Sequence, residues 1–284
     1  MNLISMCTVG DPDGFPVVFH NGTPCSRLLP PWWGRSARER NLRVLCFDRP
    51  GYGNAKAEPG RTVASEVLAT AKTLDALGVG EFATWGASGG GVYALGCGAL
   101  LGDRVVAVAC VAGNPPLGEV MEGDDYADEL RAIQEQPVNR EPLLRAYEGD
   151  SNPMRGWDLP TLLTEWDEAL SPPDKAALRD GETGEYLLAA VQEAIRPGFE
   201  GWLDDNLAYV SPWGFELADL HQPVSFWHGD EDLMTPVEGS RTLAGAVPNA
   251  ELFLIPEMGH PSLCFRNESA IMDWLVSVRE PTSA

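Results

Sequence analysis

One serine of this chain stands in a sequence context typical of a nucleophile. The pentapeptide Gly86-Ala-Ser-Gly-Gly90 fits the pattern G-x-S-x-G. The apolar run Phe82–Ala87 before it predicts a strand, and the small-residue run Gly90–Leu101 after it predicts a helix. Glycines on both sides allow a sharp turn that presents the Ser88 hydroxyl at the carboxyl end of the strand. The N–H of Gly89, at the start of the helix, would then point toward an oxyanion.

Two other interpretations of this glycine-rich segment fit less well. A Walker A loop is excluded, because no Lys-Ser or Lys-Thr pair follows the glycines. Gly89-x-Gly91-x-x-Ala94 matches a loose dinucleotide-binding pattern. However, the next predicted strand, Val105–Ala112, ends without the Asp or Glu that would bind a ribose hydroxyl. A nucleophilic serine is therefore the preferred interpretation.

A serine hydroxyl of ordinary pKa needs a general base, and the chain has only four histidines. His20 and His228 each end a predicted strand and lead into a loop, which favours structural roles. His221 precedes a strand, so it is expected at the opposite edge of the sheet from the serine. His260 follows the last predicted strand, Glu251–Ile255, and should emerge at the same edge as the serine. We therefore predict that His260 is the base.

An acid that orients this base must leave the same edge of the sheet. The segment after the penultimate strand offers Asp230, Glu231 and Asp232. The signals for the start of a helix begin at Thr235-Pro236, which places Asp232 in the loop. Spacing alone slightly favours Asp232 and leaves Asp230 as the alternative.

The elements needed to position these residues alternate along the chain. Short apolar runs separated by amphipathic segments predict an α/β fold with a doubly wound, mostly parallel sheet that is buried on both faces. The predicted strands are 16–20, 42–47, 82–87, 105–112, 223–228 and 251–255, and the predicted helices between and after them are 61–77, 90–101, 237–246 and 270–278.

The alternation stops in the middle of the chain. Residues 114–215 contain no convincing strand, and helices are predicted near 125–136, 159–170, 173–180 and 185–195. We therefore expect a core made of residues 1–113 and 216–284, with a helical cap of residues 114–215 inserted between strands. The insert holds 22 of the 42 acidic residues, most of them expected on a solvated outer face. A linker would not carry four of the nine tryptophans, so the insert should pack on the core: Trp157, Trp166, Trp202 and Trp213.

Composition excludes several classes of function. A formal net charge of −22 repels nucleic acid and anionic lipid. The sequence has neither a run of apolar residues long enough to span a membrane nor a basic, apolar leader, so a cytoplasmic location is expected. The six scattered cysteines predict neither a disulfide framework nor a metal site. We expect no metal or organic cofactor and a small-molecule substrate.

Several separate motifs resemble those of the α/β-hydrolase fold family, over nearly the whole chain. The resemblance implies that Ser88, Asp232 and His260 form a catalytic triad, in the family's chain order, and it favours Asp232 over Asp230. It also implies a helical cap over the active site, as in serine-nucleophile members such as esterases and proline iminopeptidases. The matching segments are His20–Pro24 (oxyanion loop), Asp48–Gly53, Gly86–Gly90 (nucleophile turn), Gly229–Pro236 (acid loop) and Gly259–His260.

The oxyanion loop departs from the family's usual His-Gly-x-Pro-Gly. Asn21 stands between His20 and the glycine, and Cys25 replaces the final glycine. Thr23 N–H is the first choice for the second oxyanion donor and Gly22 N–H the next. Cys25 is expected to be a packed thiol, with a reactive or pocket-narrowing thiol as the alternative. The predicted pocket is lined by Asn21, Gly22, Cys25, Trp157, Trp166, Trp202 and Trp213.

The predicted function is that of a serine hydrolase. The tryptophans of the insert suit a small or medium, apolar ester or lactone, cleaved through an acyl-enzyme without a cofactor. The acids of the insert leave open an aminopeptidase that grips a free amine, and the same triad also supports hydrolysis or lysis of a carbon–carbon bond. A non-catalytic ligand-binding protein on the same scaffold is the alternative of a different class.

Overall fold

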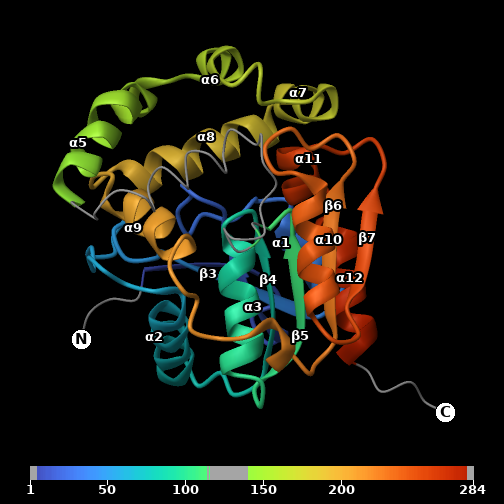
Figure 1. Cartoon of the computed structure of the whole chain (residues 1–284). Helices are drawn as coiled ribbons and strands as arrows, with labels where there is room; N and C mark the ends of the chain where they lie inside the picture. Colours follow the sequence, from blue (N-terminus) through green and yellow to red (C-terminus); the bar gives the residue numbers. More distant parts are fainter. Residues whose placement is uncertain (1–4, 114, 116–139, 280–284) are drawn as a thin grey trace.

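The computed structural model describes residues 5–113, 115 and 140–279. Its centre is a seven-stranded sheet in the order β1-β3-β2-β4-β5-β6-β7 (Figure 1). Every strand runs parallel to its neighbours except β1, which pairs with β3 in the antiparallel sense. The strands are β1 (Met6–Gly10), β2 (Phe15–His20), β3 (Leu42–Phe47), β4 (Phe82–Ala87), β5 (Val105–Val111), β6 (Val224–Gly229) and β7 (Glu251–Ile255).

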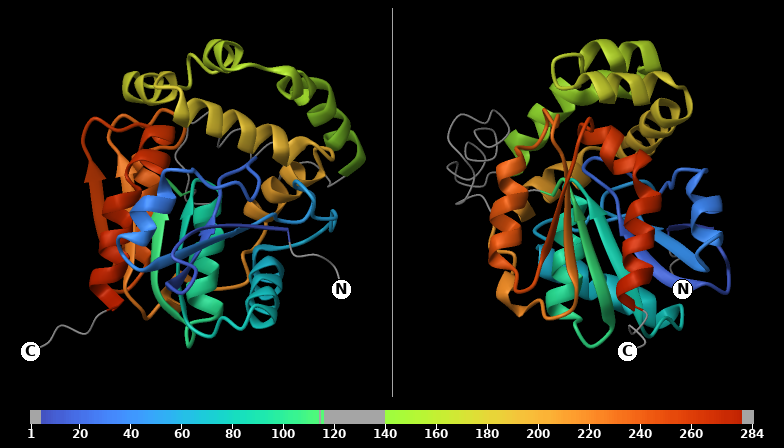
Figure 2. Two further views of the ribbon diagram at one scale, coloured as in Figure 1. Left: turned by 180° about the vertical axis from the view of Figure 1, so that it is seen from behind. Right: turned by 90° about the vertical axis from the view of Figure 1, so that its right-hand side faces the viewer.

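Helices cover both faces of the sheet, as a doubly wound fold requires. α1 and α12 lie on one face, and α2, α3 and α10 lie on the other (Figures 1 and 2). The side chains of β2 show why the strands read as continuous apolar runs: Val17 and Phe19 point to one core cluster and Val18 to the other. These helices are α1 (Trp33–Arg38), α2 (Val63–Ala76), α3 (Gly90–Leu100), α10 (Val237–Ala246) and α12 (Glu268–Arg279), with the short α11 (His260–Arg266) before the last.

A helical cap is inserted between β5 and β6. In Figure 1 it lies above the carboxyl ends of the strands, with α8 and α9 nearest the sheet and α6 and α7 above α8. The helix predicted near 125–136 lies outside the described residues. The cap helices are α5 (Arg140–Ser151), α6 (Leu159–Glu165), α7 (Pro172–Arg179), α8 (Glu182–Ile195) and α9 (Glu200–Tyr209), and the 3-10 turns η2 (Asn152–Gly156) and η3 (Leu217–Asp219) accompany them.

The strand order changes direction between β2 and β4. From β2 the chain crosses to β3 on one side, whereas β4 lies on the other side of β2 and leads away to β5. The helices that follow these two strands lie on opposite faces, because α1 contributes Trp33 and Ala37 to one core cluster and α3 contributes Val92 and Leu95 to the other. Ligand sites of open α/β sheets lie at such a point, outside the carboxyl ends of the strands. The loops that leave this point begin at His20 and at Ser88.

The predicted fold is confirmed, including the mostly parallel sheet and the inserted cap. The structure adds the antiparallel edge strand β1 and four helices, α1, α5, α9 and α11, that periodicity did not indicate. Helix α9 was not predicted because its polar residues are buried: Asp204, Asp205 and Asn206 are at most 3% exposed. A helix whose polar side is buried has no simple amphipathic pattern. Among the described residues, no helix is long and apolar enough to cross a membrane.

Candidate active site

Ser88 occupies a strained turn between β4 and α3. Its φ is +52°, in the left-handed region that a non-glycine residue rarely adopts. Ser88 N–H donates to the carbonyl of Val111 at 2.8 Å, which holds the turn against β5. A Cβ on Gly86 would lie 2.1 Å from Gly90 O, and one on Gly90 would lie 2.0 Å from His20 O. The two outer glycines of the pentapeptide are therefore required by close backbone packing.

The loop after β2 lies directly against this serine. A Cβ on Gly22 would be 3.3 Å from Ser88 Cβ and 3.9 Å from Ser88 Oγ, so a glycine lets this loop pack closely against the serine. Gly22 N–H donates to Asn21 Oδ1 at 3.0 Å. This N–H is therefore already engaged, which favours Thr23 N–H over Gly22 N–H as the second oxyanion donor.

His260 and Asp232 are brought together at the same edge of the sheet. Asp232 Oδ2 lies 2.7 Å from His260 Nδ1, and Thr235 Oγ1 lies 3.2 Å from the same nitrogen. Asp230, the alternative acid, is exposed and accepts the backbone N–H of Glu257 instead. The geometry therefore separates two acids that spacing alone left open.

The charges of this pair support each other. Burial disfavours an imidazolium at His260, but the adjacent Asp232 carboxylate outweighs it and raises the pKa of His260 above its usual value. Burial likewise opposes the Asp232 carboxylate, and His260 nevertheless lowers its pKa to about 2. Asp232 is therefore ionised at neutral pH and can stabilise a charged His260.

Two of the other histidines are buried and neutral. Burial, reinforced by the Arg49 charge, lowers the pKa of His20 to about 3. Burial also lowers the pKa of His228, whose Nε2 lies 3.0 Å from the carbonyl of Thr235 and whose Nδ1 lies 2.7 Å from Ser240 Oγ. A carbonyl only accepts, so Nε2 carries the proton and Nδ1 accepts from Ser240. Both nitrogens are engaged, which suits a structural role.

Ser88 and His260 are not hydrogen-bonded to each other in the described part of this structure. Within the described part of the chain, the side chain of His260 contacts Asp232 and Thr235 through Nδ1, and no hydrogen bond joins it to Ser88 Oγ. Such bonds are often long without substrate and tighten when one binds.

Arg49 binds two backbone carbonyls of the oxyanion loop. Its Nη1 donates to Asn21 O at 2.6 Å and its Nη2 to Gly22 O at 3.1 Å. The Asn21 side chain donates to the carbonyls of Ser26 and Leu28, so it braces the loop from within. Asn21 therefore shapes the loop, in addition to the pocket position predicted for it.

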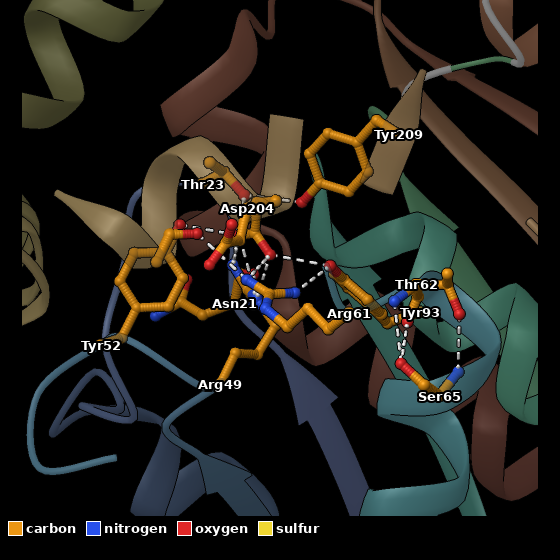
Figure 3. A network of polar contacts seen from close by, with 12 residues as sticks. Asn21, Thr23, Arg49, Tyr52, Arg61, Thr62, Ser65, Tyr93, Asp204 and Tyr209 are labelled. Carbon is orange, nitrogen blue, oxygen red and sulfur yellow. Dashed lines mark hydrogen bonds and ion pairs between the residues drawn. The ribbon is translucent and has the colours of Figure 1, made fainter. Parts of the chain in front are cut away.

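Arg49 is paired with a fully buried carboxylate of the cap. Asp205, on α9, accepts from Arg49 and Arg61 at 2.7 and 2.6 Å. Burial opposes its ionised form, but the two guanidinium groups outweigh this effect and hold the pKa of Asp205 well below its usual value. Three hydroxyls of the network in Figure 3 also donate to the Asp205 carboxylate. Those of Thr23 and Tyr52 donate to Oδ2, and that of Tyr93 donates to Oδ1.

A second buried aspartate of the cap holds the loop of His260. Asp174, on α7, is 0% exposed and accepts the backbone N–H groups of His260 and Ser262 at 3.0 and 2.9 Å. It also accepts the hydroxyls of Ser171 and Ser262. The start of α11 is therefore held by the cap through its backbone, while the His260 side chain contacts Asp232 in the core.

The other predicted pocket residues have mixed environments. Trp157, Trp166 and Trp202 are half-buried in the cap, where Trp202 makes an edge contact with Tyr147, and their place in a pocket stays a prediction. Trp213 instead packs beside Phe215 in the core cluster of α2 and α3. Cys25 is buried, and burial raises the pKa of its thiol to about 12, which fits a packed thiol. Among the described residues, no cluster of His, Cys, Asp and Glu could hold a metal ion.

Sequence reasoning missed the residues that support this site: Arg49, Asp174, Asp205 and Tyr209. Arg49 lies within the recognised segment Asp48–Gly53, but its partner is 156 residues away. The two aspartates stood among many acids expected on a solvated face. One local signal existed: Asp205 and Tyr209 are spaced i, i+4 and so share one face of a helix.

Comparisons with known proteins show the family of this fold. Residues 16–266 match the family model described as the alpha/beta hydrolase fold. No curated protein matches the chain in sequence. Similar solved structures include a carboxylesterase of Nitrososphaera gargenis, with a TM-score of 0.71, 16% identity and coverage of 97% of this chain and 94% of that one. A bromoperoxidase of Bacillus anthracis has a TM-score of 0.68, 20% identity and coverage of 97% and 95%.

An enol-lactonase of Burkholderia xenovorans LB400 is similar as well, with a TM-score of 0.63, 16% identity and coverage of 97% of this chain and 95% of that one. Identities this low show a shared fold and leave the reaction open. The family model, by contrast, spans most of the chain, including all the loops described above. The chain belongs to the α/β-hydrolase fold family.

Proposed function

We propose that this protein is a serine hydrolase that cleaves a small or medium, apolar ester or lactone. The observation that carries the proposal is the left-handed Ser88 at the strand–helix turn, lying against the Gly22 loop where the strand order changes direction. The paired His260 and Asp232 at the same sheet edge support it. An esterase and a lactonase among the similar structures make this substrate class reasonable.

In the proposed mechanism, Ser88 Oγ attacks the carbonyl carbon while His260 takes its proton. The N–H groups of Gly89 and Thr23 would hold the oxyanion of the tetrahedral intermediate. His260 then protonates the leaving alcohol and activates a water molecule that releases the acid from Ser88. Asp232 keeps the proton of His260 on Nδ1 and stabilises the imidazolium.

The buried acids of the cap weigh against an aminopeptidase. Asp204 and Asp205 are paired with Arg140, Arg49 and Arg61, and Asp174 is saturated by N–H and O–H donors. These carboxylates are therefore already compensated and would gain little from a substrate amine.

A fluorophosphonate probe tests the nucleophile. We expect stoichiometric labelling of the wild type on Ser88 and no labelling of Ser88→Ala, because only an activated serine attacks phosphorus at a useful rate. Ser211→Ala, which removes an exposed serine on the cap side, serves as the matched control and should label like the wild type. Mass spectrometry of the labelled peptide is the measurement.

Absence of labelling in folded wild type would favour a ligand-binding protein on this scaffold. Substrate class is then measured with p-nitrophenyl esters of increasing acyl length, lactones and aminoacyl nitroanilides. Turnover of the nitroanilides alone would contradict the ester proposal. Labelling without turnover of any of these would point to carbon–carbon bond chemistry.

A further inference from the structure

The hydroxyl of Thr23 lies at the centre of a short polar chain between the cap and the oxyanion loop. Its Oγ1 is 2.7 Å from Asp205 Oδ2 and 2.6 Å from Tyr209 Oη, both on α9. The Nη2 of Arg49 donates to it as well, at 3.2 Å. Figure 3 shows Thr23 and Tyr209 facing each other across this contact. The proposed oxyanion donor is therefore held through its own side chain by the cap.

The charge of Asp205 determines the direction of the hydrogen bonds that join Tyr209, Thr23 and Asp205. Asp205 is ionised between two arginines, so it only accepts, and the Thr23 O–H must donate to it. Thr23 Oγ1 is then an acceptor, and the Tyr209 O–H donates to it. Burial raises the pKa of Tyr209 well above its usual value, which keeps this donor protonated. The relay therefore runs from Tyr209 to Thr23 to Asp205.

The same carboxylate also fixes the peptide that carries the Thr23 N–H. Gly22 O accepts from Cys25 N–H at 2.9 Å and from Arg49 Nη2, and Arg49 is held by Asp205. In a trans peptide the N–H points opposite to the carbonyl of the preceding residue. Holding Gly22 O against Arg49 therefore aims the Thr23 N–H away from Arg49.

The Tyr209 hydroxyl reaches the other proposed donor too. A Cβ on Gly89 would lie 2.3 Å from Tyr209 Oη and 2.9 Å from Thr23 Oγ1. These two hydroxyls therefore pack against the residue whose N–H is the first oxyanion donor. Because the Tyr209 proton is directed to Thr23, this phenol acts on the site through Thr23 rather than as a donor of its own.

We propose that helix α9 of the cap positions the oxyanion hole, with Tyr209 and Asp205 as positioning residues that act through Thr23. The proposal rests on the serine-hydrolase function proposed above. It makes the cap part of the catalytic framework and not only a cover. Loosening the relay should weaken transition-state stabilisation while leaving substrate binding nearly unchanged.

The test uses Tyr209→Phe and Tyr52→Phe as a matched pair. Each variant deletes one buried phenol hydroxyl of the network, since Tyr52 Oη donates to the same Asp205 Oδ2 at 2.7 Å, but only Tyr209 contacts Thr23. We expect kcat of Tyr209→Phe to fall roughly 10-fold, with KM within about 2-fold, because the loss should be smaller than the 10²–10³-fold loss on deleting a donor. Tyr52→Phe should keep kcat within about 2-fold of the wild type. A change of about 2-fold is clearly distinguishable from the roughly 10-fold loss expected for Tyr209→Phe.

Two further measurements separate positioning from general destabilisation. A trifluoromethyl ketone, which forms an oxyanion on the serine, should bind Tyr209→Phe more weakly by the same factor as the loss in kcat. Thr23→Val removes the middle hydroxyl, and its effect on kcat should not add to that of Tyr209→Phe, because both break one relay. If Tyr209→Phe is unstable, Thr23→Val and its inhibitor affinity carry the test.

Equal losses of kcat in the two tyrosine variants would overturn the positioning role, and so would a change confined to KM. Labelling of Ser88 in the wild type is measured first and tests only the serine-hydrolase function. Its absence would overturn that function, and the positioning role with it. Labelling combined with an unchanged kcat in Tyr209→Phe would overturn the positioning role alone.

Discussion

Two aspartates only two positions apart in the loop after β6 have opposite environments. Asp232 is buried and accepts from the backbone N–H groups of Met234 and Thr235 as well as contacting His260. Asp230 is exposed and caps the turn at Glu257. Only the buried carboxylate lies in a setting where its charge acts strongly on the imidazole.

This difference predicts different effects of the same substitution. Asp232→Asn keeps the shape but removes the anion that stabilises a protonated His260, so kcat/KM should fall by about 10³–10⁴-fold. Asp230→Asn changes an exposed side chain and should leave kcat/KM within about 2-fold, since such surface changes have small energetic effects. Steady-state kinetics on an ester substrate gives both values. Similar losses in the two variants would contradict the role proposed for Asp232.

At the scale of elements, three cap helices each contact a different part of the loops around Ser88. Helix α7 holds the start of α11 through Asp174. Helix α8 holds the loop after β2, where Ser26 N–H donates to Ala190 O and Tyr186 O–H donates to Leu28 O. Helix α9 holds Thr23. Cap and core therefore share their polar contacts at the loops that carry the proposed chemistry.

The contact made by α7 leads to a prediction for Asp174→Asn. One oxygen of the carboxylate becomes an N–H donor that faces donors, so the buried backbone N–H of either His260 or Ser262 loses its acceptor. We expect a loss of about 1–3 kcal/mol in the free energy of unfolding per unsatisfied group. The variant should also have reduced kcat/KM, since the backbone of His260 would be less well fixed.

A matched control for this substitution is Asp158→Asn, at the start of α6. Asp158 also accepts a backbone N–H of a cap helix, from Thr161 at 2.9 Å, but it is exposed. Asparagine caps a helix as well as aspartate does, so both stability and turnover should stay near the wild type. Urea denaturation and kinetics measure the two effects. An Asp174→Asn variant as active as the control would show that α7 does not position His260.

For the whole molecule, the net charge of −22 conceals how few acids are buried. Glu66 on α2 is one of them, and burial, only partly opposed by Arg61 and Arg49, raises its pKa to about 7. Between pH about 4.5 and about 7 the folded protein therefore binds a proton at Glu66 that the unfolded chain has lost. The contribution of Glu66 to stability is complete below this interval and is lost as the pH rises through it.

Glu66→Gln should therefore remove part of the pH dependence of stability. The glutamine cannot ionise, so the variant should exceed the wild type in the free energy of unfolding at pH 9 relative to pH 4.5, by a few kcal/mol at most. Glu81→Gln removes the same charge from an exposed position and is the control. Urea denaturation at the two pH values measures the difference. Parallel pH dependence in Glu66→Gln and the wild type would contradict the prediction.

Local sequence patterns were enough to predict six of the seven strands and the presence of the helical insert. Helix α10 and strands β3, β4 and β7 begin and end where the apolar runs predict them. The turn at Ser88 could be predicted because its glycines, its strand and its helix all lie within about twenty residues. His260 followed from chain order, since parallel strands release their carboxyl-end loops at one edge.

The environments of individual acidic residues could not be predicted from local sequence patterns. Asp205 and Asp174 look like the solvated acids around them, and only their long-range partners, Arg49 and the backbone of His260, reveal their roles. A buried carboxylate is stabilised by donors that tertiary packing brings to it, and no local pattern encodes which donors those are.

By itself, then, the sequence determined the doubly wound sheet, the presence of a helical insert and the order of serine, acid and histidine, because each depends on short-range periodicity or on the direction of strands. The sequence favoured Asp232 over Asp230, but only the tertiary structure showed that Asp232 contacts His260, that Gly22 N–H is engaged, and that cap aspartates hold the loops around Ser88. The physical reason is that charge and hydrogen-bonding capacity act over a few ångströms in space, between residues that lie up to 233 positions apart in the chain.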